Sequence, residues 1–96
     1  MKFKKLEIED VILIEPFKFE DARGHFYENY REDKLNLFLK KKIKFCQENK
    51  SLSYKNVFRG LHYQLPPFAQ SKLVSVIKGS IIDVIVDIRN NSTTFG

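Results

Sequence analysis

A run of polar side chains that could do chemistry lies between Arg59 and Leu73, in the sequence RGLHYQLPPFAQSKL. It places an arginine, a histidine, a glutamine and a lysine among strand-forming residues, around a Pro-Pro turn. His62 and Gln64 are two residues apart and would project from the same face of a strand. Gly60 can bend the chain there, since a glycine within a strand often marks a bulge beside a site.

This residue set favours proton transfer over metal chemistry. Glutamine at position 64 is a poor transition-metal ligand, and the ammonium group of Lys72 has no lone pair while it is protonated. An imidazole titrates near neutrality and can take a proton from a substrate, so we interpret His62 as a Brønsted base. Lys72 opens the next strand after the turn and could face His62 across a cavity. We expect no metal and no cofactor.

The rest of the chain is predicted to be mainly β-structure. Apolar alternation bounded by turn residues predicts one or two strands in residues 3–15, a short extended piece at 17–19, and a turn at Asp21 to Gly24. Further strands are predicted at residues 25–30, 43–47, 57–64, 72–77 and 81–88. One helix is predicted from Arg31 to Lys42, because Leu35, Phe38 and Leu39 recur at helical spacing.

Many short strands with one brief helix indicate an all-β sandwich or barrel, built as a single domain over residues 1–96. The last strand alternates most clearly. Ile82, Val84, Val86 and Ile88 share one face, and Asp83 and Asp87 lie on the other face with Ile81 and Ile85. This pattern predicts two carboxylates on a second, partly buried face.

Composition and charge exclude several classes of protein. The net charge of +5 is spread over both halves, and no nucleic-acid-binding motif accompanies it. The lysines at 40–42 and 44 are interpreted as a solvated helix end, with a polyanion site as the alternative. The longest apolar run, Val11 to Ile14, is too short to span a bilayer, and acidic residues follow the first lysines where a signal peptide would have its apolar core. We expect a cytoplasmic protein, with no nucleic-acid or membrane partner, in which Cys46 serves packing.

Three separated motifs resemble the dTDP-4-dehydrorhamnose 3,5-epimerase family. They are DARGHFYENY, FCQENKS and RGLHYQLPPFAQSKLVSVIKGSIIDVIVDIRNNSTTFG, which occur in the family's order, and the resemblance runs from Val11 to Gly96. It implies a cupin-type jelly roll, an epimerase of nucleotide-linked sugars and a homodimer. In such enzymes a ketone at C4 acidifies the hydrogens on C3 and C5. A base removes one of them, and a proton returns to the opposite face.

The resemblance implies a role for most of the polar residues singled out above. His62 becomes the base, and Lys72 stabilises the enolate oxygen. Residues implied to contact the nucleotide diphosphate or the nucleobase are Arg23, Glu28, Gln47, Asn49 and Arg59. Asp83 is a further candidate from strand facing, either orienting Lys72 or His62 or forming a structural ion pair. Phe26 and Tyr27 are expected to pack in the core, and His25 to be a half-exposed strand residue.

The sequence departs from the family in two respects. The family's proton donor, a tyrosine, and the aspartate that pairs with its histidine belong to the second half of the domain, so we expect a jelly roll that is incomplete at the C-terminus. Lys50 stands where the family usually has a histidine.

Three functions remain open. They are a 3,5-epimerase of a 4-keto-6-deoxy sugar in deoxysugar biosynthesis, a related enzyme such as a single-centre epimerase, a ketoisomerase or a 4-keto-heptose epimerase, and a non-catalytic nucleotide-sugar binding module.

Overall fold

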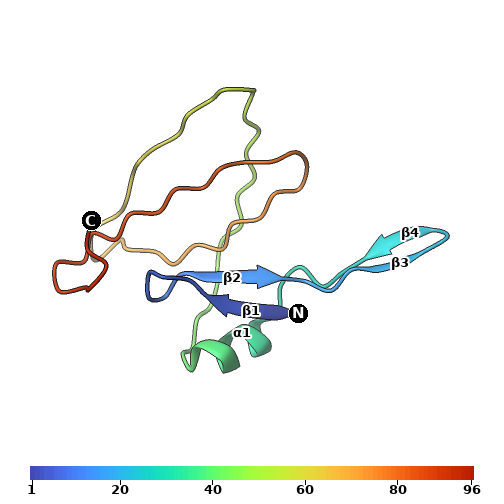
Figure 1. Ribbon diagram of the computed structural model, residues 1–96, viewed down its shortest axis with the longest axis horizontal. Helices are drawn as coiled ribbons and strands as arrows, with labels where there is room; N and C mark the ends of the chain where they lie inside the picture. Colours follow the sequence, from blue (N-terminus) through green and yellow to red (C-terminus); the bar gives the residue numbers. More distant parts are fainter. The chain divides into compact units, whose positions relative to one another are not determined.

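The computed structural model describes residues 1–96, which divide into two units. One unit comprises Met1–Ile43 together with Ile82–Gly96, and the other comprises Lys44–Ile81. All regular secondary structure belongs to the first unit, as two β-hairpins and one helix (Figure 1). That the chain forms a single domain stays a prediction.

The first hairpin joins β1, Lys2–Lys5, to β2, Ile12–Glu15, in antiparallel register with Phe3 opposite Ile14. Its connection is closed by backbone hydrogen bonds from Leu6 to Val11 and from Val11 to Ile8. Asp10 takes a left-handed backbone conformation there, with φ 69°. Aspartate tolerates this conformation better than most residues, so it suits the connection between the two strands. The prediction of one or two strands in residues 3–15 is confirmed, with two strands present.

The second hairpin pairs β3, Phe19–Asp21, with β4, Gly24–Phe26. Ala22 and Arg23 form the turn between Asp21 and Gly24, whose φ is +131°. Aspartate at the first turn position and glycine at the fourth are typical of a tight β-turn. The predicted turn is therefore confirmed, although β4 is shorter than the strand predicted at 25–30.

The helix α1, Glu32–Leu39, confirms the helix predicted from Arg31 to Lys42 within narrower bounds. Leu35 is its buried residue, and the ring of Phe38 stacks on Phe3 of β1 with centroids 5.2 Å apart. The helix ends at Lys40, which is left-handed with φ 54°. The lysines consequently follow the helix, and its last turn carries no basic residue.

Asn36 closes the turn after the helix. Its side-chain amide donates to the Ile43 carbonyl at 3.1 Å, and its side-chain oxygen accepts from the Ile43 N–H at 2.9 Å. One side chain thereby satisfies both backbone groups of a residue outside the helix.

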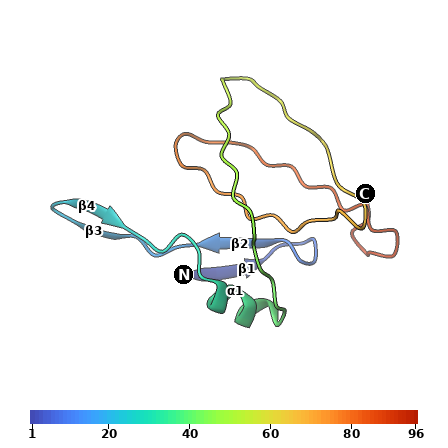
Figure 2. The same cartoon turned by 180° about the vertical axis from the view of Figure 1, so that it is seen from behind.

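The strands predicted at 43–47, 57–64, 72–77 and 81–88 are not present in the structure. Figure 2 shows the stretch from Lys44 to Ile81 without helices or strands. A strand exists only where its backbone N–H and C=O groups pair with a neighbouring strand, and these four segments form no such ladder. The alternating apolar residues of these segments would suit a strand, but within residues 1–96 the segments pair with no other strand.

The all-β prediction is consequently correct only in part. The structure has four short strands and one helix, and most of its large apolar side chains are exposed, with Leu35 the one buried hydrophobic residue. Phe26 is 67 % exposed and Tyr27 37 % exposed, so the expectation that they pack in a core was wrong for this structure. The β3–β4 hairpin that carries Phe26 is a separate two-stranded sheet, and Phe19 opposite Phe26 is exposed as well. The helix is also too short to cross a membrane.

Candidate functional site

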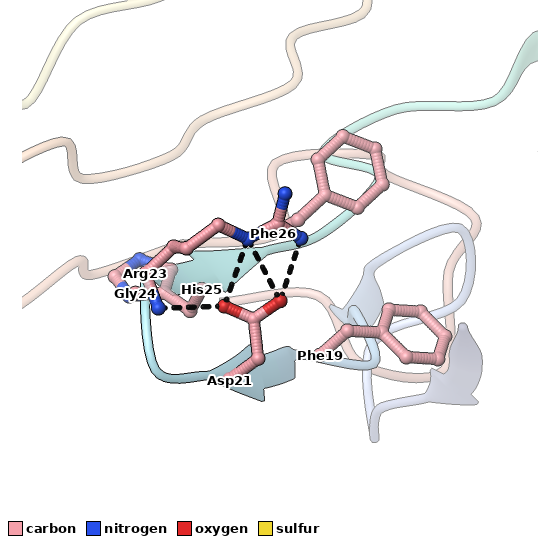
Figure 3. A pocket seen from close by; sticks show the side chains of 6 residues that line it. All are labelled: Phe19, Asp21, Arg23, Gly24, His25 and Phe26. Carbon is pink, nitrogen blue, oxygen red and sulfur yellow. Dashed lines mark hydrogen bonds and ion pairs between the residues drawn. The ribbon is translucent and has the colours of Figure 1, made fainter.

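A hollow of about 450 Å³ lies on the β3–β4 hairpin (Figure 3). Its lining combines two charged groups with aromatic rings and is formed by Phe19, Asp21, Arg23, Gly24, His25 and Phe26. Phe19 and Phe26 are directly opposite each other in the hairpin register. Of the residues predicted to contact a nucleotide, Arg23 is the one that lines this hollow.

Arg23 is held by the carboxylate of Asp21. Its Nη2 donates to Oδ2 at 2.7 Å, its Nε lies 3.3 and 3.4 Å from the two oxygens, and its backbone N–H donates to Oδ1 at 2.8 Å. Figure 3 shows the guanidinium lying across the carboxylate. This hydrogen bonding lowers the pKa of Asp21 and raises the pKa of Arg23. Both side chains are exposed, so a ligand can reach them.

Glu28 is engaged elsewhere in the same unit. Its carboxylate pairs with Arg31 at 3.1 Å, and Arg31 also pairs with Asp33 of α1 at 2.6 Å. The two carboxylates raise the pKa of Arg31, with Asp33 the larger influence. Glu28 thus links the segment after β4 to the first turn of the helix, and its ion pair is with Arg31 whereas that of Arg23 is with Asp21.

The other three predicted nucleotide contacts belong to the Lys44–Ile81 unit. The Gln47 side-chain amide donates to the Asn49 side-chain oxygen at 3.1 Å. Arg59 donates from Nε to the Ser53 hydroxyl at 2.9 Å and from Nη2 to the Leu52 carbonyl at 3.2 Å. The structure therefore brings Gln47 and Asn49 together and fixes Arg59 against the segment just before it.

Gly60 has a backbone conformation that favours glycine, although the strand in which it was predicted to form a bend or bulge is not present. Its φ is +105°, and a Cβ added there would lie 3.2 Å from Nδ1 of His62. A side chain at this position would be strained and would crowd the imidazole. Glycine at position 60 is therefore a local requirement for the placement of His62.

The three residues assigned to proton chemistry belong to different units of the structure. His62 and Lys72 are exposed within the Lys44–Ile81 unit, and Asp83 is exposed in the other unit. No side-chain hydrogen bond or ion pair involves any of them. Their roles stay predictions. The chain also contains no cluster of three or more His, Cys, Asp and Glu side chains arranged to hold a metal ion.

Asp87 has a buried carboxylate and is 5 % exposed, whereas Asp83 is exposed. The sequence pattern predicted that both carboxylates would lie on a partly buried face. The predicted burial of this face is therefore correct for one carboxylate and wrong for the other. Asp87 accepts hydrogen bonds from Ser92, from Thr94 at 2.7 Å, and from the backbone and side chain of Arg89. These bonds, led by the one from Arg89, hold the pKa of Asp87 far below its usual range. Hydrogen bonding to hydroxyl and guanidinium groups in the sequence DIRNNSTT thus accounts for its burial.

Arg89 connects this carboxylate to the β1–β2 hairpin. It donates to the Glu9 carbonyl at 3.1 Å and lies 3.5 Å from Asp10, which also pairs with Lys41 at 2.8 Å. The Lys41 hydrogen bond is the main cause of the lowered pKa of Asp10. Lys41, one of the lysines interpreted as a solvated helix end, is therefore part of an ion-pair network.

We expect Asp87→Asn to be the most destabilising of the five Asp→Asn substitutions, because an amide places a donor where the carboxylate only accepts. The pH dependence has a definite sign. The folded-state pKa of Asp87 lies below the unfolded value of 3.8, so its stabilisation is present above about pH 4 and is lost as the pH falls further. Urea unfolding at pH 6 and pH 3 measures this. The free energy of unfolding of Asp87→Asn should change less between the two pH values than that of the unsubstituted protein.

Asp83→Asn is the matched control for this experiment, since Asp83 is an exposed aspartate four residues away without a hydrogen bond. It should unfold at both pH values as the unsubstituted protein does. An equal acid sensitivity of Asp87→Asn and the unsubstituted protein would contradict the assignment to Asp87.

Comparisons with known proteins agree with the sequence motifs. The family model for dTDP-4-dehydrorhamnose 3,5-epimerase matches residues 5–96. The chain is 48 % identical to the enzyme of that name from Shigella flexneri over all 96 residues, which cover 53 % of that protein, and 47 % identical to the one from Escherichia coli K12, with 52 % covered. It is 35 % identical to a dTDP-4-dehydrorhamnose 3-epimerase from Streptomyces niveus, and the matched residues cover 46 % of that protein. The chain thus spans about half the length of these relatives, and no solved structure matches it.

Proposed function

Because the chain belongs to the dTDP-4-dehydrorhamnose 3,5-epimerase family, we propose that the protein carrying it inverts C3 and C5 of a nucleotide-linked 4-keto-6-deoxy sugar, in deoxysugar biosynthesis of the dTDP-L-rhamnose type. The observation that carries the proposal is the match of the family model to residues 5–96, with identity of 48 % over the whole chain. The matched residues include every residue to which a catalytic or binding role is assigned below.

In the proposed reaction, His62 removes the acidic hydrogen next to the ketone. The electron pair of the broken C–H bond moves onto the C4 oxygen as an enolate, and a proton delivered to the opposite face of the carbon inverts the centre. Lys72 stabilises the enolate oxygen by charge and hydrogen bonding, which is strongest where water is excluded. Asp83 is proposed to orient one of these two groups.

The nucleotide diphosphate or the nucleobase is proposed to contact Arg23, Glu28, Gln47, Asn49 and Arg59. The exposed guanidinium of Arg23 supports its part, because guanidinium groups bind phosphate oxygens through paired hydrogen bonds. The amide pair of Gln47 and Asn49 offers donors and acceptors suited to a nucleobase edge. No cofactor takes part in this scheme. The complete domain is proposed to be a cupin-type jelly roll that functions as a homodimer.

Exchange of sugar hydrogens with solvent tests the proposal directly. The protein is incubated in D₂O with dTDP-4-keto-6-deoxyglucose, and deuterium at C3 and C5 is followed by NMR. Incorporation at both positions supports the 3,5-epimerase. Tight binding without incorporation at either position would refute the enzyme in favour of a nucleotide-sugar binding module.

The second candidate is a related enzyme that acts on one centre, and the similarity to the 3-epimerase from Streptomyces niveus favours it among the alternatives. Deuterium at C3 but not at C5 would identify this function. The same spectra distinguish it from the first candidate, because the two hydrogens give separate signals.

A further inference from the structure

The carboxylate of Asp21 contacts both the backbone and the side chain of Arg23. Oδ1 accepts the backbone N–H of Arg23 and thereby closes the turn, while both carboxylate oxygens contact the guanidinium of the same residue. One acidic side chain therefore determines the backbone at position 23 and the direction of the side chain that leaves it.

The contacts leave one edge of the guanidinium unoccupied. Asp21 takes the edge formed by Nε and Nη2, and Nη1 forms no hydrogen bond. A guanidinium carries five N–H donors in a fixed plane, so Nη1 keeps both of its donors and Nη2 keeps one. This free edge has the spacing for two parallel hydrogen bonds to a phosphate group.

We infer that Asp21 is a positioning residue, which holds Arg23 by the Nε–Nη2 edge so that the Nη1–Nη2 edge is presented to a phosphate of the nucleotide. The inference rests on the proposed function, in which Arg23 contacts the diphosphate. Asp21 itself does not touch the ligand in this arrangement. Its contribution is to fix a long side chain, 90 % exposed, that would otherwise lose conformational freedom on binding.

Asp21 has two opposing effects on the affinity for a diphosphate. Pre-organisation of Arg23 strengthens binding, whereas the negative charge of Asp21 repels a diphosphate. Because Asp21 and Arg23 are exposed, the repulsion is weakened by water and salt. We therefore expect pre-organisation to dominate at physiological ionic strength.

Asp21→Asn tests the inference, since the asparagine oxygen can still accept the Arg23 N–H and keep the turn while the ionic hold on the guanidinium is lost. Binding of thymidine diphosphate to the protein carrying this chain, measured by calorimetry, should weaken by roughly 3- to 10-fold. In turnover the KM should rise with kcat unchanged, because the residue acts on binding alone. Asp21→Ser, which can also cap the turn, should give the same result.

Glu20→Gln is the matched control, because Glu20 is an exposed carboxylate on the same strand without a hydrogen bond. It should leave the Kd unchanged. The decisive variant is the double substitution Asp21→Asn with Arg23→Ala, which should bind as weakly as Arg23→Ala alone, because Asp21 has no guanidinium left to position.

The outcomes separate this inference from the proposed function. Unchanged or tighter binding by Asp21→Asn, or an effect of Asp21→Asn that persists without Arg23, would overturn the positioning role. Unchanged binding by Arg23→Ala would instead remove Arg23 from the proposed diphosphate contacts.

Discussion

Replacement of His62 by glutamine is expected to lower the rate of deuterium incorporation at C3 and C5 by about 10²- to 10⁴-fold, the usual contribution of a positioned general base. Glutamine has a similar size and can form hydrogen bonds, but its side-chain amide does not take up a proton near neutral pH. Binding of the nucleotide sugar should be affected much less, because in the proposed reaction the base acts on the sugar carbon, whereas other residues contact the nucleotide. The measurement is the initial rate of deuterium uptake at saturating substrate.

Tyr63→Phe is the control for this substitution. Tyr63 is exposed next to His62 and has no role in the proposed reaction, so its variant should keep the exchange rate. If His62→Gln exchanged deuterium as fast as the unsubstituted protein, the base would have to be another residue. A loss in both variants would indicate damage to the whole segment and would not support a specific role for His62.

The elements that were predicted correctly are those determined by neighbouring residues. Aspartate and glycine at the ends of the second turn, and apolar residues at helical spacing around Leu35, act within a few positions of the chain. The helix was predicted too long because its end depends on the backbone at Lys40 and on the hydrogen bonds between Asn36 and Ile43. Neither signal is evident from hydrophobic spacing.

The strands predicted from residue 43 onward were wrong because strand formation depends on residues far apart in the sequence. Alternation in residues 81–88 shows that the segment could pair, but pairing requires a partner strand, which the sequence pattern of one segment does not specify. The same reasoning explains Asp83 and Asp87. Alternation placed them on one face, whereas the structure buries only Asp87, because Arg89, Ser92 and Thr94 fold back onto that carboxylate.

The candidate site was predicted as a set of residues, and its local contacts were not. The motif DARGHFYENY identified Arg23, but the role of Asp21 was interpreted only as turn chemistry. An aspartate two residues before an arginine, with glycine next, was the available signal, since a turn of this kind brings both side chains to the same end of a hairpin. His62 and Lys72 were assigned from chemistry and resemblance alone, and both assignments stay predictions, since each is exposed and without a hydrogen bond.

Replacement of Lys72 by methionine is expected to lower kcat by about 10²- to 10³-fold, which corresponds to about 2.7–4 kcal/mol of lost transition-state stabilisation. Methionine keeps the length and the apolar stem of lysine but removes the charge. The C4 oxygen is neutral in the bound ketone and becomes negative only in the enolate. The loss should therefore fall on kcat, while the KM changes by much less. Deuterium incorporation at both C3 and C5 should slow together, because both enolates place their charge on the same oxygen.

Lys78→Met is the matched control, since Lys78 is another exposed lysine of the same unit and follows the strand segment predicted at 72–77. It removes the same positive charge from the protein, so a general effect of net charge on the attraction of an anionic nucleotide would be seen in both variants. A specific role in the enolate requires that only Lys72→Met loses kcat. Lys72→Arg distinguishes charge from geometry, because it keeps the charge on a wider group. Full activity in Lys72→Met would exclude the enolate role, and an equal rise in KM for both lysine variants would assign Lys72 to the attraction of the nucleotide.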